Sequence, residues 1–386
     1  MVFPKRRLMT PGPTQTPQSA RLAMARELIN HRTDEFRAVI AEAVEGLKYV
    51  FRTANDVLIL SSSGSGAMEA AVVNAAPRGG KVLVLESGKF AERWRRIAEA
   101  FGIEVVRYEL PWGQAFAPDQ VAELLRQHPD IVAVFATLME TSTGVGHDIA
   151  GLGRVVGQTP ALFVVDGISG VGVMECRTDD WGIDILVVGA QKALMTPPGL
   201  AFVAVSDKAW RQIESFRHPA FYFDLSAYRK AAAAGDTPYT PAIPLVLALV
   251  ESLRLIRQAG IENLWTRGRL LAEAVRAGVS ALGFRLVAER PAEGMTAAFP
   301  PAEVDAKLFL RRLEARFGVK LAGGQGPLKD RIVRIAHFGQ IDEFDILGLL
   351  AAMELVLVEL GEKIKLGSAV AEVQRVLAAP VARGNG

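Results

Sequence analysis

The sequence predicts an α/β fold with a mainly parallel, seven-stranded sheet covered by helices, followed by a smaller α+β domain. Short runs that are apolar on both faces alternate with helical patterns through the first two-thirds of the chain. Such runs are typical of parallel strands buried between two helical layers. From about residue 240, long helical patterns alternate with short strand-like pieces instead. We therefore expect an N-terminal arm at residues 1–20 that joins the small domain, a large domain at 21–254 and the small domain at 255–386.

The individual elements follow from hydrophobic periodicity. In the large domain the expected strands are residues 57–60, 81–85, 103–106, 131–135, 162–165, 185–188 and 201–205. The expected helices between them include 67–76, 90–101 and 118–127. Later in the chain, helices are expected at 243–258, 261–282, 304–317 and 342–360, and strands at 284–287, 295–299 and 332–335.

Composition excludes several classes of partner. The 386 residues carry 44 Lys and Arg against 42 Asp and Glu, a formal charge of +2, and the basic residues are scattered. This disfavours a nucleic-acid surface or an anionic-membrane anchor. The longest apolar runs, such as 131–139, are about half of the ~18 residues that a membrane span needs. With no apolar segment behind the basic residues near the start, we expect a cytoplasmic protein.

A metal or iron–sulfur centre is not expected. The single cysteine, Cys176, cannot form an internal disulfide, and one thiol cannot hold an iron–sulfur cluster. The five histidines show no spacing that places two ligands on one helix face or strand. The run Arg93, Arg95 and Arg96 is interpreted as a solvated helix face.

Three features could carry chemistry. The Ser- and Gly-rich residues 61–66 follow a strand and precede a helix, which suits them to a phosphate, although a simple capped turn has the same composition. Asp166 closes the strand 162–165, where it is either functional or a helix cap. Lys192 follows the strand 185–188 among small and apolar residues. Desolvation there would lower its pKa and make it a nucleophile, whereas a snorkelling lysine is the alternative.

Together these features match the needs of pyridoxal phosphate: a phosphate cradle, an acid for the pyridinium nitrogen and a Schiff-base lysine. The chain resembles the class V aminotransferases of the fold-type I pyridoxal-phosphate enzymes, and among them the alanine–glyoxylate and serine–pyruvate (serine–glyoxylate) aminotransferases. The resemblance runs over nearly the whole length, through the segments at residues 10–14, 140–145, 191–194 and 333–336.

The resemblance implies a role for each matching residue. Lys192 would form the Schiff base and Asp166 would bind the ring nitrogen. Phe90 would stack on the cofactor ring, Thr141 would lie near its hydroxyl, and Arg334 would bind the substrate carboxylate beside Gly12. The residues that would bind the phosphate are Ser63, Gly64, Ser65 and Gln191, with Tyr239 and Thr240 reaching from the neighbouring subunit of a homodimer.

The family's activity would be transfer of an amino group from alanine or serine to glyoxylate or pyruvate. Relatives often carry tryptophan where this chain has Phe90, and some carry histidine where it has Ser65; both departures bear on substrate preference. Three alternatives stay open: another class V reaction of the lyase or desulfurase type, a non-catalytic or hydrogenase-associated subunit, and a binding module without cofactor.

Overall fold

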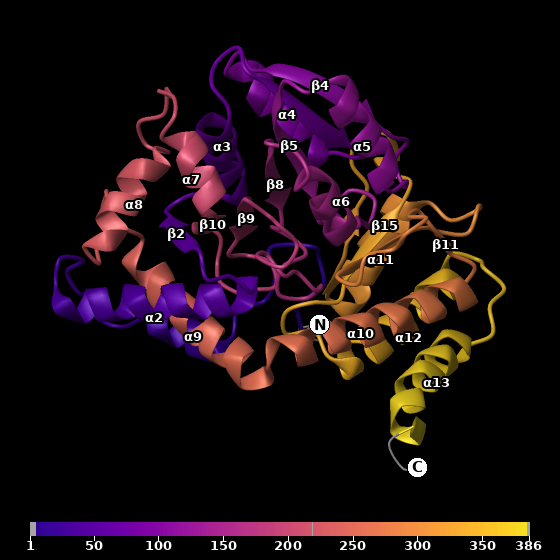
Figure 1. Ribbon diagram of the computed structural model, residues 1–386. Helices are drawn as coiled ribbons and strands as arrows, with labels where there is room; N and C mark the ends of the chain where they lie inside the picture. The colour runs from indigo at the N-terminus through magenta and orange to yellow at the C-terminus, as the bar shows by residue number, and fades with distance from the viewer. Residues whose placement is uncertain (1–4, 218, 384–386) are drawn as a thin grey trace.

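The computed structural model describes residues 5–217 and 219–383. Its centre is a seven-stranded sheet in the order β2-β10-β9-β8-β5-β3-β4 (Figure 1). Neighbouring strands are parallel except for β10, which is antiparallel to both β2 and β9, so the predicted mainly parallel sheet is confirmed. The strands are β2 (Asp56–Leu60), β3 (Lys81–Glu86), β4 (Glu104–Glu109), β5 (Ile131–Thr137), β8 (Leu162–Asp166), β9 (Ile185–Gly189) and β10 (Ala201–Val205).

Helices cover both faces of this sheet. Alternate residues along one strand belong to different cores: Leu58 and Leu60 pack on one side, Val57 and Ile59 on the other. This two-sided burial is why the strands are continuous apolar runs. One layer contains α3 (Gly64–Ala75), α4 (Ala91–Ala100), α7 (Asp207–Ile213) and α8 (Leu225–Ala233). The other contains α2 (Asp34–Phe51), α5 (Pro118–Gln127), α6 (Ile149–Val156) and α9 (Ile243–Ala259), with α1 (Gln18–Met24) packed on α9.

The C-terminal part has its own core, between an antiparallel sheet in the order β11-β12-β15-β14 and a group of helices (orange to yellow in Figure 1). Its strands are β11 (Arg285–Leu286), β12 (Met295–Phe299), β14 (Ala322–Gly323) and β15 (Val333–Ala336). Its helices are α10 (Ile261–Ala281), α11 (Ala306–Phe317), α12 (Glu343–Glu359) and α13 (Ser368–Arg383), with a 3₁₀ turn at Gly326–Leu328.

The start of the chain reaches this C-terminal part. Strand β1 (Arg7–Leu8) pairs in parallel with β13 (Val319–Lys320). The boundary expected after residue 254 falls inside α9, and Gly260, with φ of 82°, separates α9 from α10. The division into 1–20, 21–254 and 255–386 stays a prediction.

Most expected elements lie within a few residues of their predicted ends, but the start of α3 was predicted wrongly. The sequence placed residues 61–66 in a loop and began the helix at Ala67, whereas α3 begins at Gly64 with Ser63 as its N-cap. The glycine content suggested an extended loop, but Gly64 and Gly66 lie within the first turn, so the serines are part of the helix terminus itself. Within the described residues, no helix is long and apolar enough to cross a membrane.

Two helix glycines predict opposite effects on stability. Gly153 in α6 is buried, and a Cβ there would overlap the Trp181 carbonyl oxygen, so Gly153→Ala should lower the free energy of unfolding by about 3 kcal/mol. Gly348 in α12 has no atom within 4 Å of an added Cβ. Gly348→Ala should therefore raise the free energy of unfolding by about 0.5–1 kcal/mol, because alanine has the higher helix propensity. Urea unfolding of both variants measures this, and equal effects would contradict the packing described for α6.

Candidate active site

The candidate site lies at the carboxyl ends of the parallel strands, where open α/β sheets bind ligands. Asp166 is the last residue of β8, and Gln191 and Lys192 follow the end of the neighbouring strand β9. Strand β2 leads into the N-terminus of α3 at Ser63. The topology therefore brings together three segments that are far apart in the sequence.

The N-terminal arm packs against Lys192. The Lys192 amine donates to the Pro11 carbonyl oxygen at 2.5 Å, and the Thr14 hydroxyl donates to the Lys192 carbonyl oxygen at 2.8 Å. Gly12 has φ of 121°, and a Cβ there would overlap the Lys192 side chain. Only glycine allows the arm to approach the amine this closely. This contact accounts for the glycine at position 12.

Burial alters the pKa of both titratable groups at the strand ends. Asp166 is 4% exposed, and desolvation raises its pKa to about 7, although its Oδ1 accepts a hydrogen bond from the Ile168 amide at 2.8 Å. Desolvation lowers the pKa of Lys192 to about 8, against a smaller opposing effect of Asp166. Both groups therefore change protonation near neutral pH, as acid–base residues of active sites do.

Arg334 in β15 is held by backbone acceptors from two parts of the chain. Its Nε donates to the Gly323 carbonyl oxygen at 2.7 Å, and one terminal nitrogen donates to the Thr141 carbonyl oxygen at 2.8 Å. Burial lowers its pKa to about 10. Two of its five N–H donors are used in this way, which fixes the plane of the guanidinium and leaves donors for an anion. The Thr141 hydroxyl lies 3.0 Å from the Ser169 hydroxyl.

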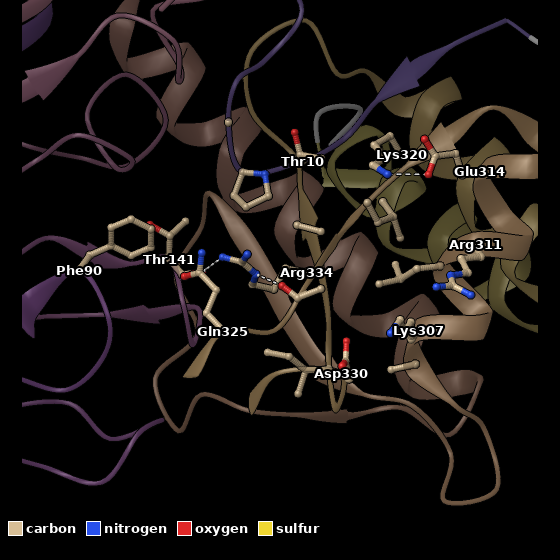
Figure 2. Close-up of a pocket in the computed structure, with 18 of the residues that line it drawn as sticks. Thr10, Phe90, Thr141, Lys307, Arg311, Glu314, Lys320, Gln325, Asp330 and Arg334 are labelled. Atoms are coloured by element: carbon tan, nitrogen blue, oxygen red, sulfur yellow. Dashed lines mark hydrogen bonds and ion pairs between the residues drawn. The ribbon is translucent and has the colours of Figure 1, made fainter. Parts of the chain in front are cut away.

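Lys192 and Arg334 line one pocket of about 390 Å³, whereas Asp166, Gln191 and residues 63–65 are not part of its lining. Gly12, Phe90, Thr141, Lys192 and Arg334, all predicted from the sequence, line it together. Figure 2 shows Phe90 beside Thr141 with Arg334 next to them, and the charged side chains of α11 on the other side of the pocket. Several other polar residues of the lining had no role assigned from the sequence, among them Lys307, Arg311 and Gln325. The Gln325 side-chain oxygen is buried without a hydrogen-bond partner, as in polar groups that await a ligand.

The start of α3 carries free polar groups. The Ser63 side chain makes no capping hydrogen bond, and the buried Gln191 side-chain oxygen has no partner. Ser65 accepts a hydrogen bond from Arg93 at 2.9 Å. The interpretation of Arg93 as part of a solvated helix face is therefore wrong for this residue, because α4 packs on α3 and turns Arg93 toward Ser65.

Tyr239 and Thr240 are not among the residues that line the Lys192 pocket. The Tyr239 hydroxyl donates to the Phe221 carbonyl oxygen at 2.8 Å, and its ring stacks on Tyr222 with centroids 4.7 Å apart. Thr240 is exposed. Within this chain, Tyr239 therefore belongs to a surface aromatic group, and neither residue contributes to the pocket wall.

Glu140 is a buried residue whose importance the sequence analysis missed. One carboxylate oxygen accepts from the amides of Phe90 and Ala91 at 3.1 and 2.9 Å, and the other accepts from the amide and hydroxyl of Ser142. It thereby joins the start of α4, which carries Phe90, to the segment that carries Thr141. The sequence showed a carboxylate within residues 140–145, a segment that resembles the family, but it did not show which groups this carboxylate binds.

Comparison with known proteins agrees with this geometry. A family model described as aminotransferase class V matches residues 8–333. The chain belongs to the class V aminotransferase family. It is 41% identical to a Synechococcus protein named soluble hydrogenase, small subunit, over 97% of this chain and 98% of the relative. It is 36% identical to an L-aspartate–glyoxylate aminotransferase of Paracoccus denitrificans, over 95% of each chain.

Two further class V relatives bear on fold and substrate. A serine–glyoxylate aminotransferase of Methylorubrum extorquens is 33% identical, over 96% of this chain and 95% of the relative. The crystal structure of a ureidoglycine–glyoxylate aminotransferase from Bacillus subtilis superimposes with a TM-score of 0.93 and 28% identity, over 98% of this chain and 99% of that chain. The expected fold and family are thus confirmed.

The burial of Asp166 predicts a pH-dependent stability for this aminotransferase in the absence of ligand. Because its folded pKa of about 7 exceeds the unfolded value near 4, stability should fall as pH rises from about 4 to 7. Three pKa units correspond to about 4 kcal/mol. Asp166→Asn should therefore be the more stable protein at pH 8, with the difference nearly gone at pH 4.5. Urea unfolding at the two pH values tests this, and a wild type that is more stable than the variant at pH 8 would contradict it.

Proposed function

We propose that this protein transfers the amino group of alanine or serine to glyoxylate or pyruvate, using pyridoxal phosphate bound covalently through Lys192. The observation that carries the proposal is the Lys192 amine, whose pKa is lowered to about 8 in the same pocket as the buried guanidinium of Arg334. The first group is a nucleophile near neutral pH and the second binds a carboxylate. An enzyme that acts on an amino acid through pyridoxal phosphate needs both groups.

The residues at the strand ends fit this cofactor. Asp166, whose pKa burial raises to about 7, would regain its charge beside a protonated ring nitrogen. The start of α3, with Ser63, Gly64 and Ser65, offers backbone and hydroxyl donors and a helix N-terminus for the phosphate, and the Gln191 side chain would donate through its amide nitrogen. Phe90 would stack on the ring, and Thr141 would lie near the ring hydroxyl.

When bound, the cofactor supplies an electron sink for the bond that breaks at the substrate Cα. Once the substrate amine has displaced it, the free Lys192 amine would take the Cα proton and later give a proton back, for which a pKa near 8 is suitable. Arg334 holds the substrate carboxylate through its remaining donors, so that the Cα–H bond faces the amine. Gly12 leaves the space that the Lys192 side chain needs.

Aspartate is a second candidate donor, because Lys307 and Arg311 also line the pocket. The sequence had offered no second cation for a distal carboxylate. A relative named for aspartate and glyoxylate favours the same possibility. Both cations are exposed on α11, however, whereas Arg334 is buried, so we retain the small donors as the main proposal.

The alternative activities receive less support. A desulfurase needs a reactive thiol, but Cys176 is buried and desolvation raises its pKa to about 12. Two relatives are named hydrogenase subunits. In the described part of this chain, no group of three His, Cys, Asp or Glu side chains could hold a metal ion. A binding module without cofactor would not explain why Lys192 and Asp166 are buried with altered pKa values.

The proposed assembly is a cytoplasmic homodimer in which Tyr239 and Thr240 contact the phosphate in the neighbouring subunit. Its support is the surface aromatic group of Phe221, Tyr222 and Tyr239, in which Phe221 is 82% exposed. Large exposed aromatic side chains of this kind mark interaction surfaces.

Replacement of the lysine should separate cofactor binding from turnover. Lys192→Ala removes the covalent bond and the proton carrier but leaves Ser63, Ser65, Gln191 and Asp166 in place. The variant should retain weakened cofactor binding and lose at least about 10³-fold in kcat, as expected when a nucleophile and general base is removed. Equilibrium dialysis and steady-state assays measure the two quantities. A variant with near-normal turnover would contradict the proposal.

The donor preference follows from Arg334, the buried guanidinium that is available to a substrate carboxylate. Single-turnover rates with alanine and serine should exceed those with aspartate and glutamate, since an unpaired distal carboxylate is costly to bury. Arg334→Lys should lower kcat/KM for every donor about 10- to 100-fold, because lysine lacks the bidentate fork. If aspartate is instead the fastest donor and Arg311→Met removes that advantage, the second candidate replaces the first.

A further inference from the structure

A guanidinium without an acidic partner lies beside the start of α3. Arg93 is half-buried on α4 and donates to the Ser65 hydroxyl at 2.9 Å. Its guanidinium carbon lies 5.2 Å from the centroid of the Phe90 ring, within cation–π range. Arg95 and Arg96 on the same helix form ion pairs with Glu86, Glu92 and Glu99. Among the described residues, no carboxylate lies within 4.0 Å of the Arg93 nitrogens.

The positive charge of Arg93 acts on both titratable groups at the strand ends. Desolvation is the main cause of both altered pKa values, raising that of Asp166 and lowering that of Lys192. The positive charge of Arg93 opposes the rise for Asp166 and adds to the fall for Lys192. A half-buried cation that is paired with no acid favours an anion nearby. The adjacent polar groups are the Ser65 hydroxyl and the first turn of α3.

The hydrogen bond to Ser65 has a directional consequence. A serine hydroxyl has one donor and two acceptor sites. Because Arg93 occupies an acceptor site of Ser65, the hydroxyl hydrogen remains available to donate to another group. Donation to an anion at the α3 N-terminus would then be supported by both the guanidinium charge and the helix dipole.

We propose that Arg93 is a positioning residue for the cofactor phosphate, acting through Ser65 and supplying the positive charge that residues 63–65 lack. The inference rests on the proposed use of pyridoxal phosphate. The contact with Phe90 gives Arg93 a second fixed point, so that one side chain connects the phosphate-binding and ring-stacking residues. Lysine could supply the charge at this position but lacks the planar fork.

The test measures binding of two ligands without an aldehyde, pyridoxine 5′-phosphate and pyridoxine, which differ only in the phosphate and do not react with Lys192. Arg93→Met should weaken binding of the phosphate ligand roughly tenfold, about 1.4 kcal/mol, and change pyridoxine binding less than twofold. Arg93→Lys should recover part of the loss. The matched control is Arg96→Met on the exposed part of the same helix, which should change neither affinity.

A second variant tests the route through Ser65. Ser65→Ala should cause the same phosphate-selective loss, and the double variant Arg93→Met/Ser65→Ala should lose less than the sum of the two effects. If Arg93→Met folds poorly, Ser65→Ala and Arg93→Lys are each compared directly with wild type, and these two variants keep the test available.

The outcomes separate this inference from the proposed function. Equal loss for both ligands would assign Arg93 a purely structural role and overturn the inference, as would an unchanged Arg93→Met or an equal loss in Arg96→Met. Fully additive losses in the double variant would refute the route through Ser65. A wild type that binds neither pyridoxal phosphate nor pyridoxine 5′-phosphate would overturn the proposed function itself.

Discussion

The candidate site depends on the burial of an acid and an amine at the carboxyl ends of adjacent strands. Asp166 ends β8, and Lys192 follows β9, its neighbour in the sheet. Desolvation raises the pKa of the first to about 7 and lowers that of the second to about 8. Folding therefore places two groups where their charged forms are disfavoured, which costs stability unless a ligand restores favourable interactions.

The rest of the structure maintains this arrangement. The two apolar cores hold the parallel strands, and the arm closes over Lys192 because Gly12 permits close approach. Glu140 joins the Phe90 and Thr141 segments, and Thr141 in turn accepts a hydrogen bond from Arg334 in the C-terminal sheet. The site is thus assembled from the arm, the large sheet and the small sheet. A change in any of their contacts should alter the geometry around Lys192.

Sequence patterns predicted the architecture well because buried parallel strands need continuous apolar runs. They also predicted that Asp166 and Lys192 lie after such runs, and the structure has both at the carboxyl ends of neighbouring strands. Sequence patterns failed where the surroundings of a side chain depend on how helices pack against one another. Arg93 contacts Ser65 because α4 packs against α3. Lys307 and Arg311 line the pocket because α11 forms part of its wall. The early start of α3 was missed because a segment rich in glycine is usually predicted as a loop. Composition does not show that Gly64 and Gly66 lie in the first turn of a helix.

The central claim is that Lys192, and no other lysine, binds pyridoxal phosphate covalently. The most direct measurement is borohydride reduction of the protein after incubation with pyridoxal phosphate, followed by peptide mapping with mass spectrometry. The account predicts one label per chain, on the peptide that contains Lys192. A label on another lysine, or no label at all, would contradict it.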